Sequence, residues 1–207
     1  MTILTVALLS LSPSPHCPEP ITRQSDSGLS YSYLEMGFGS GDIKDDSGSY
    51  DMDQTHFGGS FELNENIFWI ASFGRGSTDF GFSGISFDID TTEFGIGFHS
   101  RASAGMDIYG TLALVDAEVS ATGYYPESLS GHAIRIGMRS MASDQLEIDA
   151  AMNMLKIESD SDPSFDRSDT SFSFGAVLKT TDTVGIGLSY STGDDFSGVL
   201  LGVRVYL

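Results

Sequence analysis

Apolar and polar residues alternate with a period of two along most of the chain from Leu29 onward. This alternation is typical of β-strands, because successive side chains of a strand point to opposite faces. The clearest example is the last segment, where every second residue is apolar: Val199, Leu201, Val203, Val205 and Leu207. Because no convincing helical period is found, the pattern predicts an all-β fold.

The same alternation recurs upstream and predicts further strands around residues 33–38, 56–63, 67–74, 93–99, 108–114, 133–139, 146–154, 171–178 and 184–190. Together with the last segment these make ten strands, an even number as in bacterial single-chain barrels. If two weak segments are not strands, the number falls to eight. Strands of about 9–13 residues are long enough to cross a bilayer with tilt.

The connections between these segments alternate in length. Residues 64–66, 140–144 and 180–183 form short connections, whereas residues 40–50, 76–86, 120–130 and 159–169 form longer and mostly acidic ones. Short turns at one rim and long loops at the other are typical of outer-membrane barrels. We therefore predict a closed antiparallel transmembrane β-barrel with short periplasmic turns, longer acidic external loops and both ends of its domain on the short-turn side.

The alternation itself does not say which face points inward, since a soluble β-protein would bury its apolar face. The polar face is rich in glycine, which weakens a solvent-facing strand but suits the crowded interior of a narrow barrel. These glycines are Gly58, Gly74, Gly95, Gly97, Gly137, Gly175, Gly185, Gly187 and Gly202. We therefore expect the polar face to line the lumen and the apolar face to contact lipid.

The few charges on the polar face carry both signs, which allows them to pair inside a closed lumen. If the turn between the segments at 133–139 and 146–154 centres on Ala142, Arg135 faces Asp149. The first and last strands would bring Glu35 and Arg204 together where the barrel closes. The predicted lumen charge network consists of Glu35, Arg135, Arg139, Glu147, Asp149 and Arg204. Its expected role is to satisfy these charges and plug the lumen.

Composition narrows the function. The net charge is -19, from 10 basic and 29 acidic residues, so nucleic acid is not expected as a partner. The only cysteine, Cys17, excludes an intrachain disulfide. An apolar run from Ile3 to Leu11 precedes a Ser-Pro-Ser-Pro sequence, so residues 1–28 are predicted to be a signal-like leader with a linker. Residues 29–207 are predicted to form the barrel domain.

The apolar C-terminal alternation resembles that of small bacterial outer-membrane β-barrel proteins, which usually end in Phe where this chain has Leu207. The segments 29–35 and 67–73 also look like strands of porin-like proteins with a single outer-membrane β-barrel domain. The resemblance covers about residues 29–207. It implies a Gram-negative cell envelope, and insertion machinery that reads Val199, Leu201, Val203, Val205 and Leu207. Such families include pores, adhesins, stabilising proteins and a few enzymes.

A search for catalytic chemistry finds no phosphate-binding loop, no G-x-S-x-G motif and no H-E-x-x-H motif. His56 and His99 are expected on the lumen face, and His132 on the lipid side. His99 and Ser100 are adjacent, so they should point to opposite faces and cannot form a dyad. Asp160 and Asp162 are weak candidates for a divalent-cation site or for bridging to lipopolysaccharide phosphates, although solvated loops remain the simpler interpretation. No catalytic residue and no cofactor is predicted.

The sequence therefore predicts a monomeric, integral outer-membrane barrel without catalytic activity, which has a structural, surface-interaction or narrow-pore role. Its expected partners are outer-membrane lipid, lipopolysaccharide and the barrel-insertion machinery. Two alternatives stay open. One is a barrel-embedded hydrolase acting on peptides or lipids, and the other is a soluble secreted β-barrel that binds an apolar ligand in its interior.

Overall fold

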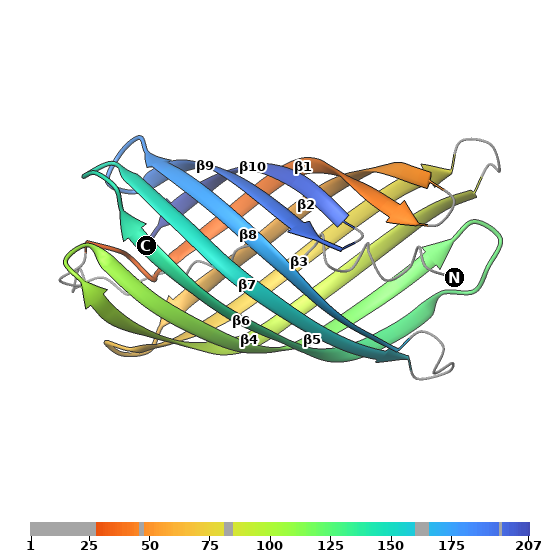
Figure 1. The fold of residues 1–207 in the computed structure, drawn as a ribbon, viewed down its shortest axis with the longest axis horizontal. Coiled ribbons are helices and arrows are strands. Elements are labelled where there is room, and N and C mark those ends of the chain that lie inside the picture. The colour runs from red at the N-terminus through yellow and green to blue at the C-terminus, as the bar shows by residue number, and fades with distance from the viewer. Residues whose placement is uncertain (1–27, 46–47, 81–84, 160–165, 195) are drawn as a thin grey trace.

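The computed structural model describes residues 28–45, 48–80, 85–159, 166–194 and 196–207, which form a closed barrel of ten antiparallel strands (Figure 1). The strands are β1 (Tyr33–Asp45), β2 (Gly48–Glu62), β3 (Ile67–Phe80), β4 (Ile85–Ser103), β5 (Met106–Ala121), β6 (Glu127–Met141), β7 (Leu146–Ser159), β8 (Arg167–Lys179), β9 (Val184–Gly193) and β10 (Phe196–Tyr206). Each strand pairs with its sequence neighbours, and β1 pairs with β10 to close the barrel. The predicted fold class and the number of ten strands are confirmed.

We call the end that carries Gly28 and Leu207 the inner end, and the opposite end the outer end (Figure 1). The outer-end loops expected at 40–50 and 76–86 are shorter than predicted, whereas residues 122–126 and 160–166 do connect strands within the segments expected at 120–130 and 159–169. Strands β1 and β2 run through most of 40–50, and β3 and β4 run through most of 76–86. Strands β1 to β8, with 13 to 19 residues each, are thus longer than the roughly 9–11 residues that a bilayer requires, whereas β9 and β10 have 10 and 11 residues. Within the described residues there is no helix that is long and apolar enough to cross a membrane.

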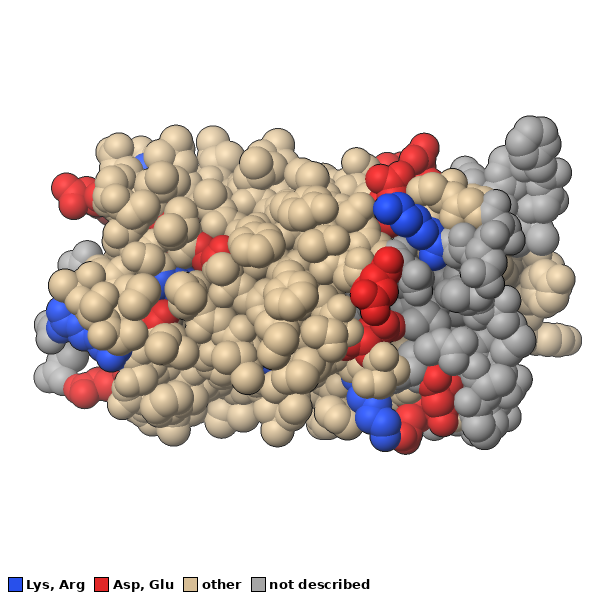
Figure 2. Space-filling view, viewed as in Figure 1, with Lys and Arg blue, Asp and Glu red and all other residues tan. Residues whose placement is uncertain are grey.

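Large apolar side chains cover the outside of the barrel around its whole circumference, and we call this band the apolar belt. Every strand contributes side chains that are about half exposed, among them Phe38, Phe57, Phe73, Phe94, Leu112, Ile136, Ile148, Phe174, Leu188 and Leu201. Figure 2 shows the same feature from one side, with uncharged residues over the broad middle and acidic residues gathered towards the right-hand end. So large an exposed apolar surface indicates contact with a membrane or with another protein.

The apolar belt ends before the strands do. At the outer end the outward-facing residues of β1, β2, β4, β5 and β7 become charged: Asp42, Lys44, Asp51, Asp53, Asp88, Asp90, Asp116, Glu118, Lys156 and Glu158. At the same level the inward-facing side chains become apolar. The barrel therefore has two parts along its axis, and their polarity is opposite.

Candidate functional site

The inner half of the lumen contains the buried charges that the sequence analysis singled out. Glu147 is fully buried and accepts hydrogen bonds from Arg139 Nη2 at 2.7 Å and from Arg204 Nη1 at 2.8 Å. Arg204 Nη2 also donates to Glu35 Oε2 at 2.9 Å. These four residues form one connected ion network that crosses the barrel from β6 and β7 to β1. Charge-assisted bonds of this kind are roughly twice as strong as neutral ones.

The β6–β7 hairpin differs from the expected register. Arg135 lies opposite Asn153 rather than Asp149, and it donates a hydrogen bond to the Asn153 side chain. Arg139 lies opposite Asp149. The physical reason is the turn, in which Ser143 Oγ accepts hydrogen bonds from the amides of Gln145 and Leu146, so the turn is centred later than Ala142.

Asp149, which was expected to pair with Arg135, instead accepts a hydrogen bond of 2.9 Å from the hydroxyl of Tyr109. Tyrosines are the part of the network that the sequence analysis did not include. The guanidinium of Arg204 lies 4.0 Å from the ring centre of Tyr33, and that of Arg139 lies 4.5 Å from the ring centre of Tyr31. The signal was present, because Tyr31 and Tyr33 continue the inward phase that includes Glu35.

The residues before β1 close the inner mouth. Leu29, Tyr31 and Ser32 are not in a strand but are almost completely buried. The Tyr31 ring stacks on His99 with a centroid distance of 3.8 Å, and the Gly28 carbonyl accepts a bond from Lys179 Nζ at 3.5 Å. Residues 28–32, which we call the mouth strap, therefore lie across the lumen entrance from β1 towards β4 and β8.

The histidines lie where the sequence placed them. His56 and His99 are buried in the lumen, and His132 is exposed on the outside. The nitrogens of His99 lie 3.5 Å from Asp107 and 3.6 Å from Glu62. Ser100 points outward, and within the described part of the chain neither nitrogen of His56 nor Nε2 of His99 has a hydrogen-bond partner.

One side of the lumen is lined by small residues. A cavity of about 40 Å³ lies between β1, β2, β8, β9 and β10, beside Gly37, Gly187 and Gly202. His56 and Glu35 border it, and Glu35 Oε1 is 3.5 Å from His56 Nε2. The volume suffices for one or two water molecules, and both nitrogens of His56 lack a hydrogen-bond partner among the described residues. The polar lumen is thus narrow rather than open.

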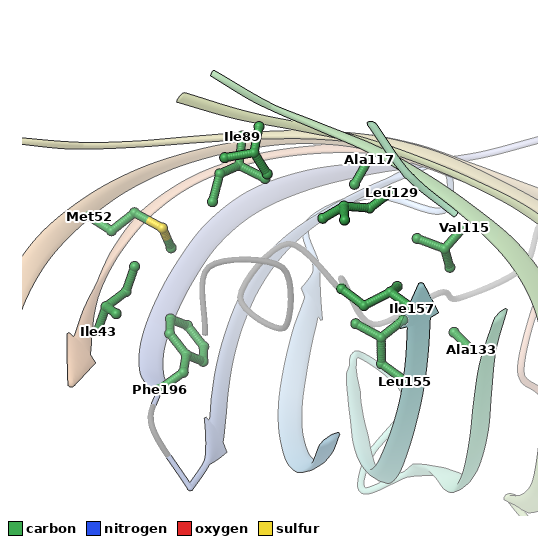
Figure 3. Packing of buried hydrophobic residues seen from close by; sticks show 11 residues of the cluster. Ile43, Met52, Ile89, Val115, Ala117, Leu129, Ala133, Leu155, Ile157 and Phe196 are labelled. Carbon is green, nitrogen blue, oxygen red and sulfur yellow. The ribbon is translucent and has the colours of Figure 1, made fainter. Parts of the chain in front are cut away.

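The outer half of the lumen is lined by a cluster of buried apolar side chains, which we call the outer core. Its members are Ile43, Met52, Ile89, Val115, Ala117, Val119, Leu129, Ala133, Leu155, Ile157 and Phe196. Figure 3 shows these side chains directed from the strands towards the barrel interior. On the outside at this level, Lys156 Nζ and Glu158 Oε1 form an exposed pair at 2.6 Å. Their hydrogen bond and their charges lower the pKa of Glu158 and raise the pKa of Lys156.

The remaining predicted residues are placed as follows. Val199, Leu201, Val203 and Val205 of β10 point outward into the apolar belt, and Leu207 follows the strand with its side chain exposed. The leader at 1–27, including Cys17, and the loop candidates Asp160 and Asp162 lie outside the described residues. Within the described part of the chain, no three His, Cys, Asp or Glu side chains are grouped as metal ligands.

No protein-family model matches the chain, and no curated protein matches it. Solved structures do match. An outer membrane channel from Pseudomonas putida F1 superposes with a TM-score of 0.54 at 6% identity, over 84% of this chain and 94% of that one. The translocator domain of the autotransporter NalP from Neisseria meningitidis gives 0.49 at 11% identity, over 85% and 88%. The first likeness supports the barrel fold and, at this identity, nothing finer.

Proposed function

We propose that the protein is an integral outer-membrane β-barrel with a closed lumen and no catalytic activity, which has a structural or surface-interaction role. The observation that carries the proposal is the reversal of polarity across the barrel wall. The apolar belt surrounds the barrel, while Arg139, Glu147 and Arg204 are buried inside it. Lipid makes this arrangement favourable, because in water the apolar belt on the outside of the barrel would be exposed to solvent.

A closed barrel fits the contents of the lumen better than an open channel does. The mouth strap covers the inner entrance, the ion network crosses the inner half, and the buried side chains of the outer core line the outer half. A barrel of few strands has an interior that side chains can fill. A narrow pore for water or small ions is the second candidate, and the cavity beside His56 and the small-residue wall favours it.

The proposed orientation places the inner end in the periplasm. The apolar belt would contact lipid. The acidic surface around Asp53 and Asp116 would lie at the level of the lipopolysaccharide head groups, where divalent cations would bridge its carboxylates to the phosphates. The outward apolar residues of β10 from Val199 to Val205, followed by Leu207, would be read by the insertion machinery. Among the described residues, all of the strand edges are paired within one chain, which is compatible with a monomer.

The first test is the electrophoretic mobility of the detergent-purified protein with and without boiling. A membrane barrel migrates differently when folded, whereas a soluble barrel without a detergent-resistant fold shows one position. The second test is conductance in planar bilayers, for which we expect no stable openings. Frequent channel openings would favour the pore, and hydrolysis of lipid or peptide substrates by the pure protein would contradict the non-catalytic proposal.

A further inference from the structure

The apolar belt has a shallow depression on the outer faces of β2 and β3. Gly59 and Ala71 lie directly opposite each other and both point outward, and because they are small, the outer surface is recessed at this position. The flanking pairs are aromatic on both sides. Phe57 pairs with Phe73 towards the outer end, and Phe61 pairs with Trp69 towards the inner end. The register thus places two small residues between two aromatic pairs.

The neighbouring strands close the remaining two sides. Leu34 of β1 lies opposite Gly59, and Phe94 of β4 lies opposite Ala71. The Phe94 ring also packs edge-on against Trp69, with a centroid distance of 5.5 Å. These side chains border an open hollow of about 490 Å³ on the outside of the barrel, which we call the exterior bowl and which Leu207 also lines.

The chemistry of the bowl restricts its occupant. Its rim consists of the apolar side chains of Leu34, Phe57, Phe61, Trp69, Phe73, Phe94 and Leu207. Glu93 also borders the bowl, but its side chain is buried on the lumen side of the wall. An empty space against the belt would forfeit dispersion contacts, so a hydrocarbon group is favoured there. A second protein copy is a poor occupant, because a stable interface needs about 20–30 residues a side. The bowl has a fraction of that size.

We propose that the exterior bowl binds one acyl chain of a phospholipid from the inner leaflet. The leaflet follows from position, because the bowl lies beside Leu207 and close to the β2–β3 turn at the inner end. The bowl holds the chain between the aromatic pairs, so this lipid exchanges more slowly than the lipid around the rest of the belt. The inference rests on the proposed membrane location and adds a defined lipid site to it.

Trp69 is the only tryptophan of the chain and lines the bowl, so its fluorescence reports occupancy. The test titrates the full-length protein in detergent with phosphatidylethanolamine whose acyl chains are brominated. We expect saturable quenching at about one lipid per protein. Ala71→Phe fills the bowl and should raise the lipid concentration for half-quenching by about tenfold or more. Ala176→Phe is the matched control, since Ala176 also points outward, from β8.

Native mass spectrometry gives the second measurement, with one retained phospholipid expected for the wild type and the control but not for Ala71→Phe. Equal, non-saturating quenching in all three proteins would overturn the proposal, because it would mean that the bowl binds lipid no more tightly than the rest of the apolar belt does. A dimer that only Ala71→Phe abolishes would overturn it in favour of a contact between copies. Because heat-modifiable mobility is measured on the same samples, failure of the bowl is distinguishable from failure of the membrane location.

Discussion

Strand β7 passes through two environments, and its side chains show the difference. Near the inner end Glu147 is buried in the lumen and its neighbour Ile148 is exposed on the outside. Near the outer end Ile157 is buried and its neighbour Glu158 is exposed. The strand geometry is the same in both places. What changes is the medium outside the wall, since lipid favours an apolar exterior and water favours an apolar interior.

The two halves of the barrel are therefore stabilised in different ways. The inner half depends on satisfying charges that have no access to water, and the outer half depends on burying apolar surface as a soluble domain does. Substitutions that exchange the two kinds of interaction should therefore have different costs in the two halves.

The largest effect is expected for Glu147→Leu, which removes the acceptor shared by Arg139 and Arg204. Breaking a buried ion pair by removing one partner typically costs about 3–5 kcal/mol, because the other charge is left uncompensated. The free energy of unfolding in urea, measured in detergent micelles, should fall by this amount. An unchanged unfolding midpoint would mean that the network is solvated and does not hold the lumen together.

A second prediction compares the same substitution inside and beyond the apolar belt. Leu112→Arg places a charge against lipid and should cost about 2–4 kcal/mol, whereas Asp116→Arg on the same face of β5 should cost at most about 1 kcal/mol. The difference locates the edge of the bilayer between the two positions. Folding yield into lipid vesicles as a function of urea measures both variants. Equal costs would contradict the division of the barrel into two halves.

The mouth strap provides the third prediction. Tyr31→Ala removes the ring that stacks on His99 and lies under the guanidinium of Arg139. Losing a desolvated cation–π contact lowers the free energy of unfolding by about 2 kcal/mol. We expect a moderate loss of stability and brief conductance events in planar bilayers. Tyr31→Phe keeps the ring and should stay silent; if it conducts as much as the alanine variant, the ring is not what closes the mouth.

The smallest effect is expected on the exposed outer surface. The folded-state pKa of Glu158 is lowered from its ordinary value of 4.5 by Lys156, so this pair stabilises the fold above that pH. The contribution is lost as the pH falls through the lowered pKa. Glu158→Gln should therefore shift the unfolding midpoint slightly at pH 7 and not at all in acid, and high salt should reduce the shift. A larger shift in acid than at pH 7 would reverse the assigned sign.

The architecture could be predicted from the sequence because alternation is a local signal that each strand carries. The phase of the alternation also placed Glu35, Arg139, Glu147 and Arg204 on one face. The partners of Arg135 and Asp149 could not be predicted, since pairing depends on the register of the hairpin, and a shift of the turn centre moves every opposite pair. The hydrogen bonds of Ser143 decide that register, and they follow from the conformation of the turn.

The sequence does not predict the outer ends of the strands, for a different reason. Acidic residues such as Asp53 and Asp116 interrupt the apolar face, which ends the signal of a lipid-facing strand. The alternation itself continues with reversed polarity, as in Val115 to Val119, where the valines and Ala117 point inward. A pattern that assumes lipid outside the wall therefore does not detect the part of the strand that has water outside it. The tyrosines could not be predicted as part of the network, because Tyr31 and Tyr33 take part through their rings, which lie against the guanidinium groups of Arg139 and Arg204.

The seam between β1 and β10 joins the two strands that lie farthest apart in the chain, and Glu35 meets Arg204 in its register. If β1 paired instead with an earlier strand, this carboxylate would be enclosed without its cation. Closure by the last strand is thus the arrangement in which the penalty disappears. The ion pair between Glu35 and Arg204 therefore favours the closed barrel in which β10 is the strand that pairs with β1.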